Sequence, residues 1–214
     1  MRRRARVLLV VAAVLLATGI AGAYMNARDT PVDPDARRAD AARLMNDLMS
    51  GNTPVGAPFT LADETGRRVS LADFRGKVVV LYFGYMFCPD VCPTDLLTIA
   101  TVLKTLGAEA EKVQPVFVTL DPGRDKPAEL ARFVKSFSPR FVALRGSEAE
   151  TREVATAYKV FYEKVLPPGS GQYVIDHTAF TFIVDAEGQY AGFFPPGTEA
   201  DRMTPVVRDV LAAR

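Results

Sequence analysis

The sequence predicts a three-layer α/β domain with a mixed central sheet, preceded by an N-terminal transmembrane anchor. Residues 7–24 form an uncharged, mostly apolar run of 18 residues behind a cluster of arginines. From residue 52 onward, short apolar runs typical of buried strands alternate with stripes of apolar residues at helical spacing. We therefore expect an anchor at 1–24, a tether at 25–51 and one folded domain at 52–214.

The N-terminal segment has the features of a membrane anchor. Four arginines lie within the first six residues, and the run Val7–Tyr24 follows them. As a helix this run spans about 27 Å, close to the hydrocarbon thickness of a bilayer. Arginines on the leading side predict a cytoplasmic N-terminus and an exported domain. Ala21-Gly22-Ala23 also fits a signal-peptide cleavage site, but the length of the run favours an uncleaved anchor in the inner membrane, with the domain on the periplasmic side.

The composition is that of a globular protein, with 49% hydrophobic and 24% charged residues. The formal net charge is +1, but four of the 26 basic residues are the N-terminal arginines. The rest of the chain carries 22 basic against 25 acidic residues, a net charge of −3. No broad basic field is present, so the composition argues against nucleic acid as a partner.

The first half of the domain begins with a hairpin and a buried strand. Residues 59–61 and 68–71 flank a turn that contains glycine, which predicts the hairpin. Residues 77–84 are almost continuously apolar, as expected for a strand covered on both faces. Residues 93–106 carry apolar side chains at helical spacing, and 113–120 read as a second buried strand.

The second half adds three helices and further strands. Asp125 is expected to cap a helix at 127–137, which starts with proline. The other predicted elements are a strand at 141–144, a helix from Ser147 to about Tyr158, a hairpin of 180–184 and 190–193, and a final helix from Thr198 to Ala213. Ser147 and Glu150 form a capping box for the second of these helices. Thr198, with Asp201, is expected to cap the last one.

Two thiols lie where a predicted buried strand runs into a predicted helix. Cys88 and Cys92 are four residues apart, which on one helical face places their Cβ atoms about 5–6 Å apart. A helix N-terminus favours anions, so we expect the pKa of both thiols to be lowered. The residues alone leave three interpretations open: an incomplete soft-metal site, a redox pair, and a permanent disulfide of an exported protein. Around the pair, Tyr85, Met86, Phe87 and Val91 would form an apolar docking surface where exposed, with at least two of the four in the core.

His177 is the only histidine of the chain. It follows the glycine- and proline-rich stretch 166–171 and precedes the predicted strand 180–184, so we expect it at an edge or end of the sheet, where the Cys loop also lies. Two thiolates and an imidazole form a soft ligand set suited to copper. Zinc would need a fourth ligand, which Asp121 or Asp176 could supply only if geometry allowed. Alternation in an extended segment points Asp176 away from a site that His177 faces.

The chain contains Cys-Pro-Asp-Val-Cys-Pro at 88–93, Thr-Leu-Asp-Pro-Gly-Arg-Asp at 119–125 and Asp-His-Thr at 176–178. These three motifs resemble the Sco/SenC family of copper-binding cytochrome c oxidase assembly proteins. The resemblance covers about residues 52–214 and implies a thioredoxin-like fold exported to the periplasmic or intermembrane side. It also implies copper, as Cu(I) with Cu(II) as a second state, bound by Cys88, Cys92 and His177.

The resemblance implies a metallochaperone, a metal-binding and transfer protein rather than an enzyme. Its implied task is to deliver copper to the dinuclear copper site of cytochrome c oxidase subunit II, or to maintain the thiols of that site. Export into an oxidising space would form a Cys88–Cys92 disulfide, so the partners include a thiol reductant as well as a copper donor and the membrane. Asp121 and Asp125 belong to the second motif, and the residues leave open whether they act in function or only shape a turn.

A thiol–disulfide reductase is the second interpretation, and a peroxidase the third. Thioredoxin-like oxidoreductases typically place two residues between their cysteines and a cis-proline opposite them. This chain has three residues between Cys88 and Cys92 and no proline within 169–194, so that face carries His177 instead. A peroxiredoxin-like site would place Thr or Ser three residues before the reactive cysteine, whereas this chain has tyrosine or proline there.

Overall fold

The computed structural model describes residues 43, 45, 46 and 54–213. The predicted anchor and nearly all of the predicted tether lie outside these residues. The chain divides into two units between Thr53 and Pro54, and the account below concerns the second unit.

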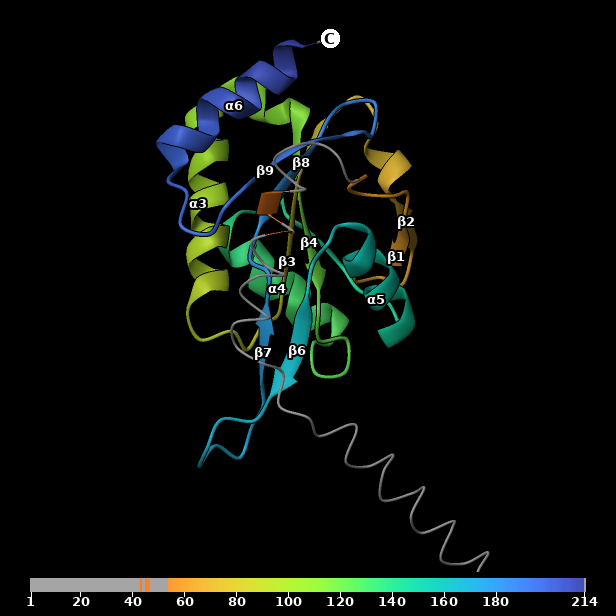
Figure 1. Cartoon of the computed structure of the whole chain (residues 1–214). Coiled ribbons are helices and arrows are strands. Elements are labelled where there is room, and N and C mark those ends of the chain that lie inside the picture. Colours follow the sequence, from red (N-terminus) through yellow and green to blue (C-terminus); the bar gives the residue numbers. More distant parts are fainter. Residues whose placement is uncertain (1–42, 44, 47–53, 214) are drawn as a thin grey trace, which may run out of the picture. The chain divides into compact units, whose positions relative to one another are not determined.

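A five-stranded mixed sheet forms the centre of this unit (Figure 1). The strands, in their spatial order, are β5 (Val142–Leu144), β4 (Val113–Thr119), β3 (Val78–Gly84), β8 (Thr181–Val184) and β9 (Tyr190–Phe194). β3, β4 and β5 are parallel, whereas β8 runs antiparallel to β3 and β9 antiparallel to β8. Every residue of β3 is buried, as its continuous apolar sequence predicts. The mixed α/β architecture expected from the sequence is confirmed.

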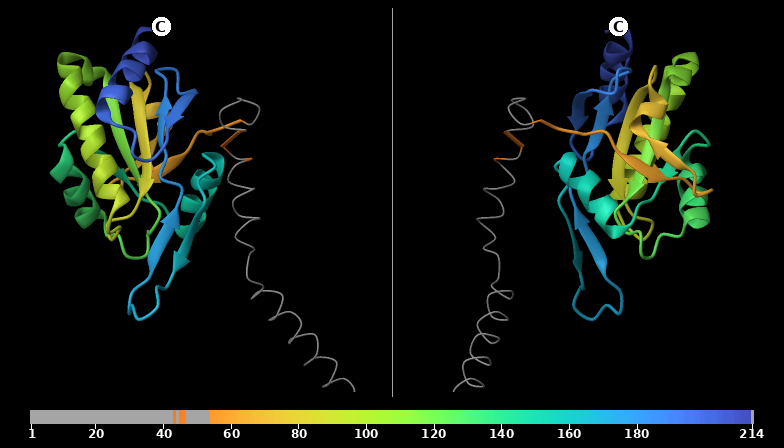
Figure 2. Two further views of the ribbon diagram at one scale, coloured as in Figure 1. Left: turned by 60° about the vertical axis from the view of Figure 1, so that its left-hand side comes forward. Right: turned by 90° about the vertical axis from the view of Figure 1, so that its right-hand side faces the viewer.

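Helices cover both faces of the sheet, which gives the three layers seen in Figure 2. The helices are α3 (Val91–Leu106), α4 (Pro127–Phe137), α5 (Glu148–Ala157) and α6 (Ala200–Ala212), with short 3-10 helices at Leu71–Phe74 and Gly107–Lys112. α3, α4 and α6 lie on one face, where Phe117 of β4 meets Phe133 of α4. α5 and the hairpin of β1 (Thr60–Ala62) and β2 (Arg68–Ser70) lie on the other. There Tyr158 packs against Phe83.

One helical stretch of the described chain, Val91–Lys112, is long and apolar enough to cross a membrane by its composition. It comprises α3 and the 3-10 turn that follows. Leu96, Ile99 and Leu103 of this stretch are buried within the domain. This burial assigns the stretch to the core of the α/β unit.

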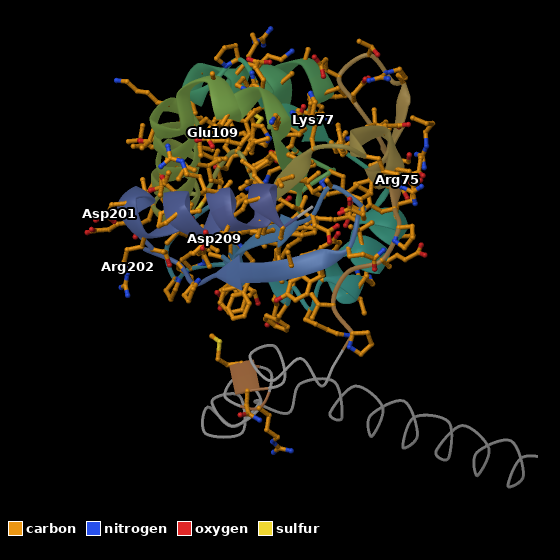
Figure 3. The ribbon with its side chains drawn as sticks, turned by 90° about the horizontal axis from the view of Figure 1, so that it is seen from above. Arg75, Lys77, Glu109, Asp201, Arg202 and Asp209 are labelled. Carbon is orange, nitrogen blue, oxygen red and sulfur yellow. The ribbon has the colours of Figure 1, made fainter. Side chains whose placement is uncertain are left out.

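The strand order brings two distant segments to one end of the sheet. Because β8 is antiparallel to β3, the end of β3 at Gly84 lies beside the start of β8 at Thr181. The loop with the two cysteines leaves β3 at this end, and the segment with His177 enters β8 there. Figure 3 views the domain from the opposite end, where charged side chains of both signs lie, among them Lys77, Glu109 and Asp209.

A hairpin that the sequence did not predict carries His177. β6 (Tyr162–Val165) pairs with β7 (Val174–His177) in a separate two-stranded sheet that projects beyond the central one (Figures 1 and 2). β6 has two adjacent charged residues at its centre and is largely exposed, so neither strand alternation nor a buried apolar run identifies it. Its strand geometry comes from pairing with β7, nine to fifteen residues further along the chain.

Two predicted helix caps are wrong. Asp125 does not cap α4, because Lys126 is the residue before the helix and the Asp125 carboxylate bonds elsewhere. Thr198 donates to the carbonyl of Pro195, and Glu199 precedes α6 without a side-chain cap. The Ser147–Glu150 capping box is confirmed, with the Glu150 amide donating to Ser147 Oγ.

Candidate metal centre

Cys88 lies in the loop 85–90 and Cys92 in the first turn of α3. The backbone of Asp90 is not helical (φ −142°, ψ −79°), so the helix begins only at Val91. The spacing predicted that the two cysteines share one helical face. This prediction is wrong, because Cys88 lies outside the helix. The loop folds back instead, and the amide of Cys92 donates to Cys88 Sγ over 3.4 Å. Both thiols are free and buried, with Cys88 8% exposed and Cys92 fully enclosed.

His177 ends β7 and faces this pair. Its Nε2 lies 3.4 Å from Cys92 Sγ, and the three ligating atoms of Cys88, Cys92 and His177 are all within 4.8 Å of one another. Nδ1 lies 3.2 Å from the carbonyl oxygen of Thr178. A carbonyl only accepts, so Nδ1 carries the proton and Nε2 is the ring nitrogen left to bind a metal. The structure thus brings together all three residues that the sequence singled out.

Two tyrosine rings fix the orientation of the imidazole. The rings of Tyr82 and Tyr85 meet that of His177 edge to face, with centroids 6.5 Å and 6.0 Å away. Both tyrosines are buried. The Tyr82 hydroxyl donates to Asp95 of α3 over 2.9 Å, which ties the ring to the helix that carries Cys92. The imidazole therefore packs against side chains anchored in β3, in the loop and in α3.

The two thiols differ in proton affinity. A hydrogen bond from Cys92 is the main cause that holds the pKa of Cys88 well below its ordinary value; burial opposes this, and His177 and the amides of Asp90 and Cys92 assist. The same bond to Cys88, together with burial, raises the pKa of Cys92. The expectation that the helix N-terminus lowers both is therefore wrong for Cys92. Only one thiol of a buried pair ionises readily, because two adjacent thiolates repel each other.

The two aspartates considered as further ligands lie outside the cluster. Asp176 is exposed on β7, one residue before His177, so its side chain points away as strand alternation predicted. Asp121 is fully buried but accepts hydrogen bonds from Tyr173 and Arg124. Within the described part of the chain, the group of possible metal ligands consists of two sulfurs and one nitrogen. That soft donor set fits copper and lacks the fourth ligand of a zinc site.

Asp125 anchors the cysteine loop through a hydrogen bond to its backbone. Its Oδ2 accepts from the amide of Met86 over 3.1 Å and from the hydroxyl of Thr119 over 2.6 Å. Its Oδ1 is buried and has no hydrogen-bond partner among the described residues. Burial raises the pKa of the Asp125 carboxyl to about 6. A proton on Oδ1 leaves both bonds to Oδ2 in place, so protonation and loop anchoring are compatible.

Asp125 gives the protein a distinctive dependence of stability on pH. Its pKa in the folded state exceeds the ordinary value of 3.8, so the folded protein binds this proton more tightly than the unfolded chain. Stability from this group therefore rises as pH falls from about 6 towards 4. Between pH 7 and pH 5 we expect the wild type to gain about 1 kcal/mol relative to Asp125→Asn, measured by urea unfolding. An equal change with pH in both proteins would contradict the assignment.

Several residues of the site were not singled out from the sequence. Gly84 lies directly under the cluster, because a Cβ there would be 2.9 Å from Cys92 Sγ. Glycine at the end of a buried apolar strand is the signal that could have found it. Tyr173 meets Asp121 across 52 residues, and no local pattern marks that contact. Of the expected docking residues, Phe87 and Val91 are exposed and Met86 is half-buried. Only Tyr85 is buried, so the expectation that at least two of the four lie in the core is wrong.

Comparison with known proteins matches the chain to one family model. The model, described as SCO1/SenC, matches residues 48–212. Among individual relatives, an SCO2-like protein of Rickettsia prowazekii is 38% identical over 141 residues, which cover 65% of this chain and 69% of that protein.

Solved structures show the same fold. The copper-bound ScoI of Arabidopsis thaliana superposes with a TM-score of 0.70 at 31% identity, covering 75% of this chain and 99% of that one. The copper-bound ScoI of Bradyrhizobium japonicum superposes with a TM-score of 0.67 at 37% identity, covering 73% and 99%. The family model spans all three residues of the cluster of two thiols and one imidazole.

Proposed function

Because this chain belongs to the SCO1/SenC family, we propose that it binds copper through Cys88, Cys92 and His177 and helps to assemble the dinuclear copper site of cytochrome c oxidase subunit II. The observation that carries the proposal is the convergence of two sulfurs and an imidazole nitrogen within 4.8 Å, from residues 85 positions apart. Relatives with copper bound and the description of Sco proteins as cytochrome c oxidase assembly proteins support it.

The site suits a copper ion that the protein binds and then transfers to a partner. Two sulfurs and one nitrogen satisfy Cu(I), which accepts low coordination numbers, and leave room for a partner's ligand to replace one of them. Phe87 is 50% exposed and Val91 39% exposed beside the site, so a partner meets apolar surface there. A copper donor loads the reduced pair, and the N-terminal segment anchors the domain on the periplasmic side of the inner membrane.

An anaerobic copper titration of the reduced full-length protein in detergent tests this function. We expect one Cu(I) per chain, with both thiols protected from alkylation. His177→Ala should weaken binding by about 10- to 100-fold while leaving two-coordinate Cu(I) on the thiols. Affinity is read by competition with a Cu(I) chelator. Tight binding that leaves the thiols reactive would show that the ion is held elsewhere.

The asymmetry of the thiol pair favours a thiol–disulfide reductase as a second candidate function. Cys88 is the more exposed sulfur and the one with the lowered pKa, whereas Cys92 is enclosed and protonated. In such an exchange the Cys88 thiolate attacks a partner's disulfide, and one partner sulfur leaves as a thiolate that takes the proton of Cys92. Cys92 then displaces the second partner thiol, so the partner gains two electrons and the chain becomes a disulfide. A thiol reductant must restore it.

Alkylation rates test this asymmetry. We expect iodoacetamide to modify Cys88 much faster than Cys92 in the copper-free protein, because the thiolate is the nucleophile and Cys92 is shielded. Mass spectrometry of digested samples follows each site. In the Cys92→Ala variant, Cys88 should form a stable mixed disulfide with an oxidised peptide that carries the two cysteines of the subunit II copper site. Equal modification of both thiols, without a trapped mixed disulfide, would remove the case for the reductase.

A further inference from the structure

A buried polar cluster connects the cysteine loop to the hairpin that carries His177. Asp121 follows β4 and is fully enclosed. Its carboxylate accepts the Tyr173 hydroxyl over 2.9 Å and forms an ion pair with the Nε of Arg124. Tyr173 is the residue immediately before β7. The cluster therefore attaches the beginning of β7 to the body of the domain.

Arg124 touches both segments at once. Its Nη1 donates to the backbone carbonyl of Tyr173 over 2.8 Å, and its guanidinium carbon lies 3.6 Å from the centroid of the Tyr173 ring. The guanidinium carbon also lies 5.1 Å from the ring centroid of Phe87 and 5.9 Å from that of Tyr85. Phe87 precedes Cys88, and Tyr85 packs against the His177 imidazole. The Arg124 guanidinium thus contacts the ring of Phe87, the residue before the proposed ligand Cys88. It also contacts the ring of Tyr85, which packs against the proposed ligand His177.

The hairpin depends on such contacts for its alignment. β6 and β7 pair with each other and not with the central sheet, and a two-stranded hairpin is marginally stable by itself. At the His177 end, Thr178 and Phe161 exchange hydrogen bonds that close the hairpin base. At the opposite end of β7, about 13 Å away along the strand, the bonds from Arg124 and Asp121 fix Tyr173. Without this second attachment β7 keeps only its base and the buried Ile175, whose backbone bonds to Tyr85, so the start of the strand is less constrained.

We propose that Arg124 is a positioning residue: it clamps the start of β7 against the cysteine loop and so holds His177 Nε2 within reach of the two thiols. The inference rests on the ligand set proposed above. Arg124 does not touch the metal ligands themselves. It acts through the Tyr173 backbone on one side and through the rings of Phe87 and Tyr85 on the other.

A double-variant cycle with His177 tests the proposal. Arg124→Gln should lower Cu(I) affinity about 10- to 100-fold, the range found when groups that orient metal ligands are removed. In the His177→Ala background the same substitution should have no further effect, because the residue it positions is gone. Arg124→Lys keeps a cation beside buried Asp121, so the variant should fold. It lacks the planar guanidinium that stacks on the Tyr173 ring and the paired N–H donors, so it should still lose Cu(I) affinity.

Arg140 provides a matched control. It is similarly enclosed, with 27% of its side chain exposed against 22% for Arg124, and it also combines an ion pair with bonds to backbone carbonyls. It lies between α4 and β5, and its guanidinium bonds to the carbonyl of Val113 at the start of β4, away from the cluster. Arg140→Gln should lower stability but leave the Cu(I) affinity within about twofold of the wild type, since distant sites act independently.

Amide hydrogen exchange of the copper-free protein gives a second readout. Arg124→Gln and Arg124→Lys should speed exchange in β7 on the order of tenfold without changing it in β3, whereas Arg140→Gln should not. Equal losses of affinity in the wild-type and His177→Ala backgrounds, or unchanged exchange in β7, would overturn the positioning role. A His177→Ala variant with wild-type affinity would instead refute the proposed ligand set, so the two failures are distinguishable.

Discussion

Replacing either cysteine with alanine will abolish tight copper binding. Cys88→Ala and Cys92→Ala each leave one sulfur and one imidazole, a poor site for a soft ion. The loss should exceed that of His177→Ala, which retains both sulfurs. The same chelator competition that measures the wild type measures each variant, and circular dichroism checks that the fold persists.

Serine at each position provides the matched control for size. Cys88→Ser and Cys92→Ser preserve the volume of the side chain but replace the sulfur with a harder oxygen. They should bind Cu(I) as poorly as the alanine variants if ligand softness decides affinity. Wild-type affinity in any of these four variants would show that the cluster is not the copper site.

The Gly84→Ala variant will lose both stability and copper affinity. A Cβ at this position would lie 2.9 Å from Cys92 Sγ, 3.0 Å from a ring carbon of Tyr82 and 3.1 Å from one of Phe117. All three neighbours are fully buried, so none can move without displacing others. We expect a loss of about 2–3 kcal/mol in the free energy of unfolding, typical of overpacking in a dense core.

Gly171→Ala is the control for this substitution. A Cβ at Gly171 meets nothing within 4 Å, so the stability of that variant should stay close to the wild type. Urea unfolding measures both proteins, and copper competition shows whether displacement of Cys92 Sγ weakens the site. Equal stability of Gly84→Ala and the wild type would mean that the strand end shifts to accept the methyl group.

Most elements of the fold follow from local patterns. The continuous apolar run at 77–84 predicts β3, and the Ser147–Glu150 box marks the start of α5, because both signals act within a few residues. The sequence did not predict the β6–β7 hairpin, because the contacts that stabilise it are not local. Its strands are short and β6 is mostly exposed. The hairpin is stabilised by pairing of the two strands and by Tyr173, which bonds to a residue 52 positions earlier.

The features of the candidate site were likewise predictable only where their sequence signal is local. Two cysteines, one histidine and their spacing were enough to name the three residues that converge, since each type is scarce in this chain. The spacing could not place Cys88 outside the helix or assign the raised pKa to Cys92. Asp125 was expected as a helix cap because it stands two residues before a proline, yet its carboxylate holds Met86 of the cysteine loop.

The sequence by itself singled out Cys88, Cys92 and His177 as candidate ligands, and it predicted the strand β3 and the helix α3 that flank the cysteine loop. The tertiary structure decided that β8 lies antiparallel beside β3, which brings His177 to the thiols, and that the Arg124 guanidinium contacts the rings of both Phe87 and Tyr173. The physical reason is the range of the interactions. Periodicity, capping and ligand chemistry act over a few residues. The pairing of β3 with β8 joins residues about 100 positions apart, and the Arg124 guanidinium contacts rings 37 and 49 positions away, so both arise only once the chain has packed.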